Sequence, residues 1–431
     1  MLARIDVRGT TGDLRAALAR SETAGPDIRA AVAEIIADVR ARGAVAVREL
    51  TARHDGADVA EPRVDPGEIA AALERTAPEL RAALELARDQ IVAWHEAQHE
   101  SVHTEMRHVR LGVDVEELVV PVDRAGCYVP GGLAPLASSV LMTVIPARVA
   151  GVAEVVLCSP PDATGRVHDA VLAAAAIAGV DGVYAIGGAQ AVAAMAYGCG
   201  ALGPVDIVVG PGNAYVVEAK RQVFGAVGID GLAGASEVAI IADGTVDAAW
   251  VAVDLLAQAE HGPGGAVALI VWDEAVAERV ERALDALLAT AERRAEAVST
   301  LEAGGRVIIV DDAARAVDVA NAIAPEHLEL MCAAAELLVP LVRNAGAVFV
   351  GAYAPAVIGD YVAGTNHVLP TGGTARFASA LRVADFHKHI HVVRADSAAL
   401  ARVGLAARSI AEAEGLHAHA DAVRMRGESP S

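Results

Sequence analysis

Hydrophobic residues in the first hundred positions recur at helical spacing. In the segment 26–42 the apolar residues that share one side of a helix are Ile28, Val32, Ile35, Ile36 and Val39. Gly43 ends this pattern, and 65–76 and 78–99 are two further helical segments. From 105 to 129 the pattern changes to short β segments, with a turn at Gly112. The N-terminal region is therefore predicted to be mainly helical.

From about residue 120 short apolar runs alternate with helical segments. The predicted strands are 155–158, 182–186, 205–209 and 237–242, and the predicted helices between them are 167–178, 189–197 and 214–223. A second series of strands follows at 267–271, 307–310 and 347–350. Strands that alternate with helices form a parallel sheet covered on both faces. The sequence thus predicts an α/β protein with two doubly wound, incomplete Rossmann-like domains and a cleft between or beside them.

These patterns divide the chain into four regions. The N-terminal region, 1–119, is expected to pack on the second α/β domain. The first Rossmann-like domain spans 120–236 and the second spans 237–381. The tail, 382–431, has a β segment at 389–393 and a helix from Ser397, and it is too short to bury a core of its own. It must pack on the main body or on a partner subunit.

Charge and cysteine content narrow the function classes. With 56 acidic and 35 basic residues the net charge is −21, which disfavours binding to nucleic acid or an anionic membrane. The four cysteines are far apart and form no C-x-x-C pair, which argues against a cysteine-based zinc site and fits a reducing, cytoplasmic compartment. The long uncharged runs at 125–147 and 182–205 contain prolines or glycines, so they favour buried core over membrane spans.

Two polar stretches are candidates for ligand binding. Gln258 and His261 are three positions apart at the end of a helix predicted at 246–260, so they share a face beside a glycine-rich turn and suit a metal. Gln is an unusual zinc ligand, and a histidine interacting with the helix dipole is the alternative. Asp360 follows a helical turn and His367 lies in the next loop, where capping and turn chemistry is the alternative.

Glu326 and His327 place an acid and an imidazole side by side in an apolar frame. Pro325 biases Ala324 away from the helix, so an extended segment is predicted to begin at Glu326. Adjacent residues on a strand point to opposite faces, so both side chains can serve one cleft only at a strand end or a bend. The alternative is a surface glutamate beside a buried structural histidine.

Three glycine-rich turns lie on the first α/β domain. They are Gly131-Gly132 after Tyr128, Gly187-Gly188 before Gln190, and the run from Gly210 to Asn213. The second and third are strand-to-helix turns, where backbone N–H groups can hold phosphates. The G-x-G-x-x-G fingerprint does not occur there, so a dinucleotide site and simple tight turns both remain open.

Taken together, these stretches resemble the histidinol dehydrogenase family from about residue 30 to the C-terminus. The matching runs are CYVPGG at 127–132, GPGN at 210–213, AGASEV at 233–238, QAEHG at 258–262, PEHLE at 325–329 and NHVLPTG at 366–372. Each run is weak alone, but their order and spacing are highly specific. The sequence departs from the family pattern at Ala235, where proline is usual, and at 386–389.

The resemblance implies a set of site residues. Four match the ligands of one catalytic Zn²⁺ per subunit: Gln258, His261 and Asp360 from one chain, and His419 from the other subunit of a homodimer that swaps its C-terminal tails. Glu326 and His327 match a catalytic acid–base pair. The residues that match substrate contacts are Ser236, Gln258, His261, His327, Asp360, His367, Glu414 and His419. The residues that match the NAD site are Tyr128, Gln190 and Asn213.

The resemblance also implies a reaction: oxidation of L-histidinol through the aldehyde to L-histidine with two NAD⁺, the last step of histidine biosynthesis. A neutral His327 is suited to take the hydroxyl proton, and Glu326 to take a proton from the water that attacks the aldehyde. Zinc would position the substrate through its amine and imidazole.

Three rival interpretations stay open. The first is a family paralogue that oxidises another small alcohol with zinc and NAD; intact Ser236, His367 and Glu414 argue against it. The second is a zinc hydrolase, which needs no dinucleotide. The third is a non-enzymatic metal-binding or assembly protein, which leaves the acid–base pair unexplained.

Overall fold

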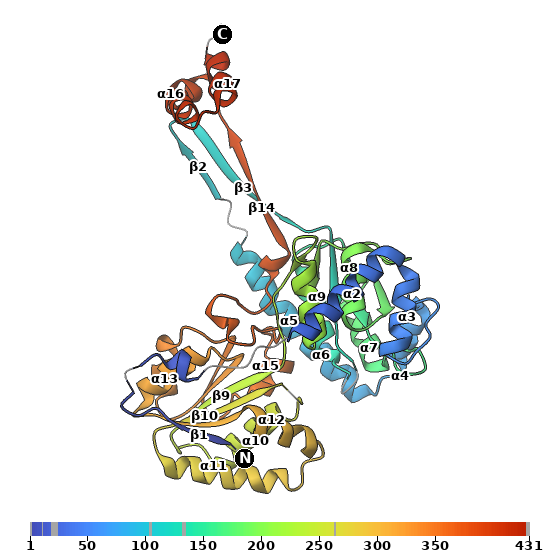
Figure 1. The fold of residues 1–431 in the computed structure, drawn as a ribbon, viewed down its shortest axis with the longest axis vertical. Helices are drawn as coiled ribbons and strands as arrows, with labels where there is room; N and C mark the ends of the chain where they lie inside the picture. Colours follow the sequence, from blue (N-terminus) through green and yellow to red (C-terminus); the bar gives the residue numbers. More distant parts are fainter. Residues whose placement is uncertain are drawn as a thin grey trace.

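The computed structural model describes residues 2–10, 12–18, 25–102, 106–131, 135–262 and 264–427. Figure 1 shows two α/β bodies and a long arm that carries the C-terminal helices away from them. None of the helices in these ranges combines the length and the apolar character that a membrane span requires.

The first α/β domain is built on a five-stranded sheet in the order β6-β5-β4-β7-β8, and every pair is parallel. Its strands are β4 (Arg124–Tyr128), β5 (Glu154–Ser159), β6 (Gly182–Ala185), β7 (Ile207–Val209) and β8 (Gly228–Ile229). Its helices are α6 (Ala137–Val149), α7 (Asp169–Ala178), α8 (Gly188–Tyr197) and α9 (Ala214–Val223). Two apolar clusters lie on opposite faces of this sheet, so its strands are buried on both sides, as expected of a parallel sheet.

The second α/β domain has a six-stranded sheet in the order β1-β11-β10-β9-β12-β13, again with every pair parallel. The strands are β1 (Ala3–Asp6), β9 (Glu237–Ala242), β10 (Ala266–Val271), β11 (Gly305–Ile309), β12 (His327–Met331) and β13 (Ala347–Val350). The helices are α10 (Ala248–Ala259), α11 (Glu274–Leu288), α12 (Arg294–Gly304), α13 (Ala313–Ile323), α14 (Ala335–Leu338) and α15 (Ala356–Tyr361). Short 3₁₀ turns cover Val339–Leu341, Thr374–Arg376 and Val383–Phe386. The predicted pair of parallel-sheet α/β domains is confirmed.

The N-terminal helices do not pack where the sequence suggested. They are α1 (Leu14–Ala17), α2 (Pro26–Arg42), α3 (Ala44–His54), α4 (Pro66–Arg75) and α5 (Pro78–Val102). Helices α2 and α3 pack on α8 and α9, while α4 and α5 pack on α6 and α7, so all four cover the first α/β domain. Strand β1 and helix α1 join the second domain, where β1 pairs with β11 and α1 contacts α13, and α5 also reaches it, since its His95 lies 3.5 Å from Asn366. Periodicity identified the apolar face of each helix but not the surface that covers it.

The arm joins two segments that are far apart in the sequence. Strands β2 (Met106–Arg110), β3 (Val113–Pro121) and β14 (His387–Arg394) form an antiparallel sheet in the order β14-β3-β2. Helices α16 (Ser397–Ala413) and α17 (His417–Gly427) pack on each other at its far end (Figure 1). The β segments before residue 120 therefore belong with the tail and not, as expected, with the second domain.

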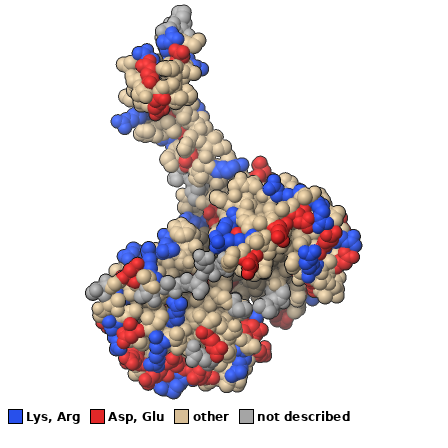
Figure 2. All heavy atoms as spheres, viewed as in Figure 1, with Lys and Arg blue, Asp and Glu red and all other residues tan. Residues whose placement is uncertain are grey.

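The tail was expected to pack on the main body or on a partner subunit, and its helices α16 and α17 project away from the main body (Figure 1). Uncharged side chains predominate along the stalk of the arm on the face drawn in Figure 2. Large apolar side chains are exposed on β3, β14 and α16: Val115, Leu118, Ile390, Val393, Leu405 and Ile410. An exposed apolar surface of this kind on an elongated segment is typical of a protein-interaction surface.

Candidate active site

The acid–base pair lies where α13 turns into the central strand β12. Ala324 ends α13 in the left-handed conformation (φ 50°, ψ 62°), so the chain leaves the helix before Pro325. Glu326 precedes the strand and His327 begins it. Both side chains are buried, and Nδ1 of His327 lies 3.5 Å from Oε2 of Glu326. The pair thus lies at a strand end, the position that the sequence requires if both side chains are to serve one cleft.

Backbone and carboxylate groups fix the imidazole of His327 from both sides. Its Nδ1 lies 3.0 Å from the carbonyl oxygen of Glu237, and its Nε2 lies 3.1 Å from Oδ1 of Asp360. The N–H of Glu237, on the adjacent strand β9, donates to Oε2 of Glu326 at 2.8 Å. Since each ring nitrogen faces an acceptor, this arrangement favours the doubly protonated imidazolium.

Burial and charge shift the acid and the base together. Burial raises the pKa of Glu326 to about 8, although the nearby charge of His327 opposes the shift. Burial by itself lowers the pKa of His327, but Glu326 and Asp360 outweigh it and raise that pKa to about 9. The sequence suggested a neutral His327, whereas the structure favours its charged form as long as Asp360 accepts from it.

The predicted metal ligands Gln258 and His261 share one end of α10. This helix begins at Ala248, after the Asp247 side chain caps Ala249 N, slightly later than predicted. Gln258 is buried, and its Nε2 has no hydrogen-bond partner in the described part of the chain. Nδ1 of His261 lies 3.0 Å from the carbonyl of Ala257, which leaves Nε2 available. His261 thus offers a ring nitrogen that can ligate a metal, while Gln258 has an unpartnered amide nitrogen and would ligate through its Oε1.

Asp360 belongs to α15 and links this helix end to the acid–base pair. Burial raises the pKa of the Asp360 carboxyl, but the hydrogen bond and charge of His327, together with the charges of His367 and His261, lower it below its usual range. The carboxylate therefore sits among imidazoles that stabilise its charged form. Across the described ranges, no group of three or more His, Cys, Asp or Glu side chains is gathered closely enough to hold a metal ion.

The predicted substrate contacts fall into two sets. Ser236 directly precedes β9, and its loop faces the turn after His261: a Cβ added to Gly264 would lie 3.4 Å from Cβ of Ala235. Nδ1 of His367 lies 2.9 Å from the carbonyl of Asp360. These residues surround the acid–base pair.

Glu414 and His419 form the second set. They lie at the far end of the arm, at α16 and α17, away from the α15 that carries Asp360 (Figure 1). One chain does not bring them to the other site residues.

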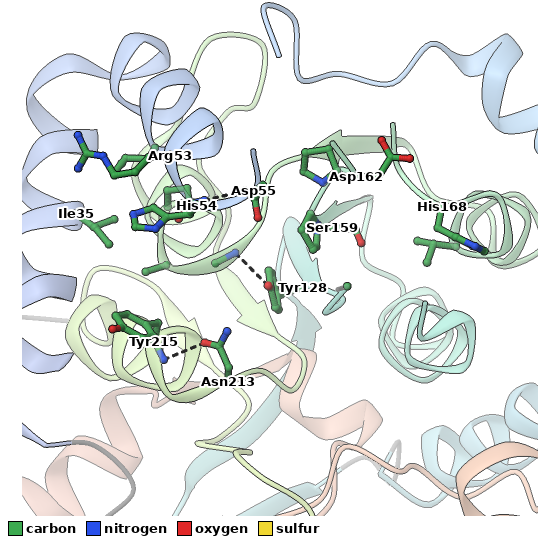
Figure 3. A pocket seen from close by; sticks show the side chains of 18 of the residues that line it. Ile35, Arg53, His54, Asp55, Tyr128, Ser159, Asp162, His168, Asn213 and Tyr215 are labelled. Carbon is green, nitrogen blue, oxygen red and sulfur yellow. Dashed lines mark hydrogen bonds between the residues drawn. The ribbon is translucent and has the colours of Figure 1, made fainter. Parts of the chain in front are cut away.

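The three predicted NAD contacts line one pocket of about 980 Å³ on the first α/β domain. Figure 3 shows Tyr128 and Asn213 facing this pocket from β4 and from the start of α9. The hydroxyl of Tyr128 accepts from Gly188 N at 3.1 Å, so it holds the turn that begins α8. Oδ1 of Asn213 caps α9 by accepting from the N–H groups of Tyr215 and Val216. The pocket therefore lies beside two helix N-termini.

The turn at Gly210 has little room for any other residue. Its φ is 117°, and an added Cβ would lie 2.1 Å from the carbonyl oxygen of Tyr128. Beneath it, the buried pair of Lys220 and Asp230 is bonded to both backbone groups of Gly210: Nζ to its oxygen at 2.9 Å, and Oδ2 to its N–H at 2.8 Å. The turn is held as a close, rigid backbone surface at the edge of the pocket.

Comparisons with known proteins identify the family of the chain. The family model described as histidinol dehydrogenase matches residues 18–427. A histidinol dehydrogenase of Rhizobium meliloti is 48% identical over 416 residues, covering 96% of this chain and 95% of its own. One from Cereibacter sphaeroides is 49% identical over 422 residues, covering 97% and 96%. The chain belongs to the histidinol dehydrogenase family.

A solved structure supports the same assignment at the level of the fold. The histidinol dehydrogenase of Elizabethkingia anophelis superimposes with a TM-score of 0.92 at 33% identity, covering 99% of this chain and 98% of its own. Membership in the histidinol dehydrogenase family identifies the protein as an oxidoreductase. It also explains why motif runs that are weak individually occur together in one chain.

Three residues that contact the predicted site residues were not predicted from the sequence. Glu237 contributes its backbone N–H and carbonyl to the acid–base pair, and a motif search does not detect backbone groups. Ser139 places its Oγ 3.0 Å from Nε2 of His367, although it lies in an uncharged run interpreted as core. Asp55 accepts from Nε2 of Gln190 at 3.2 Å, and no motif surrounds it. Only Glu237 carried a signal, since it directly follows Ser236.

Proposed function

We propose that this protein oxidises L-histidinol through L-histidinaldehyde to L-histidine with two NAD⁺, as the last step of histidine biosynthesis. The observation that carries the proposal is the buried Glu326–His327 pair, joined through Asp360 to a helix end that offers Gln258 and His261. Family membership agrees with the substrate, since the relatives are named for it. The four cysteines are buried and free, which fits the proposed cytoplasmic location.

The residues present fit a Zn²⁺ ion. Gln258, His261 and Asp360 supply an amide oxygen, an imidazole and a carboxylate, and the buried amide of Gln258 has an Nε2 without a hydrogen-bond partner among the described residues. We propose His419 of a second subunit as the fourth ligand, because His419 lies on the projecting arm. When bound, Zn²⁺ would orient the amine and imidazole of the substrate, and NAD⁺ would accept hydride.

The acid–base residues divide the chemistry between two half-reactions. In the first, His327 takes the hydroxyl proton of histidinol; it can do so once Asp360 turns to another partner and frees Nε2. In the second, Glu326 takes a proton from water as it attacks the aldehyde. The raised pKa of Glu326, about 8, makes its carboxylate a stronger base than an exposed one. Ser236, His367 and, from the partner arm, Glu414 are proposed to bind the substrate.

The proposed function predicts a stoichiometry of two. Complete conversion of histidinol should form two NADH per histidinol consumed, because the aldehyde is oxidised before it leaves. The measurement compares NADH absorbance with histidine released. A ratio of one would contradict the two-step reaction, and histidine analogues consumed without any NADH would favour the zinc hydrolase. A paralogue would instead prefer another alcohol in the same assay.

Removing a ligand should separate metal binding from folding. His261→Ala and Asp360→Ala are each expected to lower bound zinc to background while the far-ultraviolet circular dichroism stays unchanged. The reason is that α10 packs in the apolar core of the second domain and α15 packs through Gly359 against Phe349, contacts that need no metal. Metal analysis of the dialysed protein checks this. His54→Ala, on the exposed end of α3, is the control and should retain zinc. Unfolding on zinc loss would show a structural site instead.

A further inference from the structure

Asp55 holds an unusual place in the proposed NAD pocket. It follows α3 at the helix C-terminus and lines the pocket together with Gln190 (Figure 3). Its Oδ2 accepts from Nε2 of Gln190 at 3.2 Å, which fixes the orientation of that amide. A Cβ added to Gly187 would lie 2.9 Å from Oδ1, so the carboxylate is in close contact with the turn that begins α8. Asp55 is thus packed against the backbone that would meet the cofactor.

No cation neutralises this carboxylate among the described residues. Of the other acidic groups of the pocket, Asp38 pairs with Arg42 and Asp162 accepts from Thr164, while Glu34 is exposed to solvent on α2. Burial raises the pKa of Asp55 to about 6, against the opposing effect of the Gln190 hydrogen bond, so it remains mostly ionised at pH 7. The pocket therefore contains a carboxylate with unused acceptor capacity.

A carboxylate at this position can distinguish NAD⁺ from NADP⁺, which carries an additional phosphate on the 2′-oxygen of the adenosine ribose. A carboxylate accepts hydrogen bonds from sugar hydroxyls and repels phosphate. The cationic side chains that line the same pocket are Arg53 and Arg166, and Arg166 is already engaged by Glu68. The balance of free charge beside Gln190 is negative.

We infer that Asp55 is a specificity-determining residue that accepts a hydrogen bond from the adenosine ribose and excludes a 2′-phosphate, so that the pocket takes NAD⁺ and rejects NADP⁺. The inference rests on the proposed dinucleotide function of this pocket. Asp55 would select the cofactor by its charge. It lies outside the motif runs, at the end of a helix that precedes the first α/β domain in the chain.

The test measures binding separately from activity. Titration calorimetry gives the Kd of NAD⁺ and of NADP⁺ for the wild-type protein, for Asp55→Asn and for Glu34→Gln. An asparagine can still accept from Gln190, so the first variant removes charge with little loss of shape. Glu34, exposed on α2, lines the same pocket and is the matched control for a lost negative charge. The expected result is that Asp55→Asn lowers the NADP⁺/NAD⁺ Kd ratio at least about tenfold while Glu34→Gln leaves it within about twofold.

The outcomes separate the inference from the proposed function. If the wild-type protein binds neither dinucleotide, the proposed function of the pocket fails. If it prefers NAD⁺ and Asp55→Asn keeps the same ratio, the inference is wrong. An equal change of the ratio in both variants would assign selection to the overall pocket charge and would also overturn the role of Asp55. Unchanged circular dichroism of both variants ensures that folded proteins are compared.

Discussion

Glu326→Gln is expected to slow the oxidation of histidinaldehyde about 10²–10⁴-fold, the usual contribution of a general base, while slowing the oxidation of histidinol less than about tenfold. The amide oxygen can still accept the N–H of Glu237, now bonded at 2.8 Å, so the position of the side chain is retained. What is lost is the ability to take a proton from water. Single-turnover rates measured from each substrate check the two half-reactions separately.

The same substitution three residues further along the chain provides the control. Glu329 is also buried on β12, but its Oε1 accepts from Ala356 N at the start of α15 and does not contact His327. Glu329→Gln should therefore change both half-reactions in parallel, if it changes them at all. An equal loss in both half-reactions for Glu326→Gln would contradict the division of labour between Glu326 and His327.

The sequence predicted local elements well because periodicity and capping residues act over short distances. The helices Pro26–Arg42 and Ala214–Val223 and the strand Glu237–Ala242 have the predicted bounds. Each has a clear signal at its ends, such as Asn213 capping the second helix. The packing partners of α2–α5 were predicted wrongly, since an apolar stripe does not specify which surface covers it.

Longer-range pairing had no local signal. Strand β14 pairs along its whole length with β3, from Asp114 with Arg394 to Pro121 with His387, although both α/β domains separate the two strands in the sequence. The family resemblance predicted that Glu326, His327 and Asp360 share one site, although Asp360 lies outside the matching runs, and in the structure His327 lies within 3.5 Å of both carboxylates. The protonation of His327 had to come from the structure, because it depends on burial and on how closely Glu326 and Asp360 approach the ring.

The second prediction concerns the arm. His419 and Glu414 lie at its far end, so one chain cannot add them to its own Asp360 site without moving the arm (Figure 1). Exchange of arms between two subunits would complete both sites at once. His261→Ala and His419→Ala, each inactive alone, should therefore restore activity when mixed and allowed to exchange subunits. Random pairing of equal amounts makes about half of the dimers heterodimers, and each heterodimer has one intact site of its two. The mixture should therefore regain about a quarter of the wild-type activity per protomer.

A second mixture makes this result specific to exchanged arms. His419→Ala and Glu414→Ala both alter the arm, so every site in their heterodimer lacks one residue and no activity should return. His417→Ala, a histidine of the same helix with no proposed role, should be active alone and shows that changing α17 is tolerated. Subunit exchange is followed by native mass spectrometry of differently tagged chains. If heterodimers of His261→Ala and His419→Ala form and stay inactive, His419 acts within its own chain and the swapped-arm proposal is wrong.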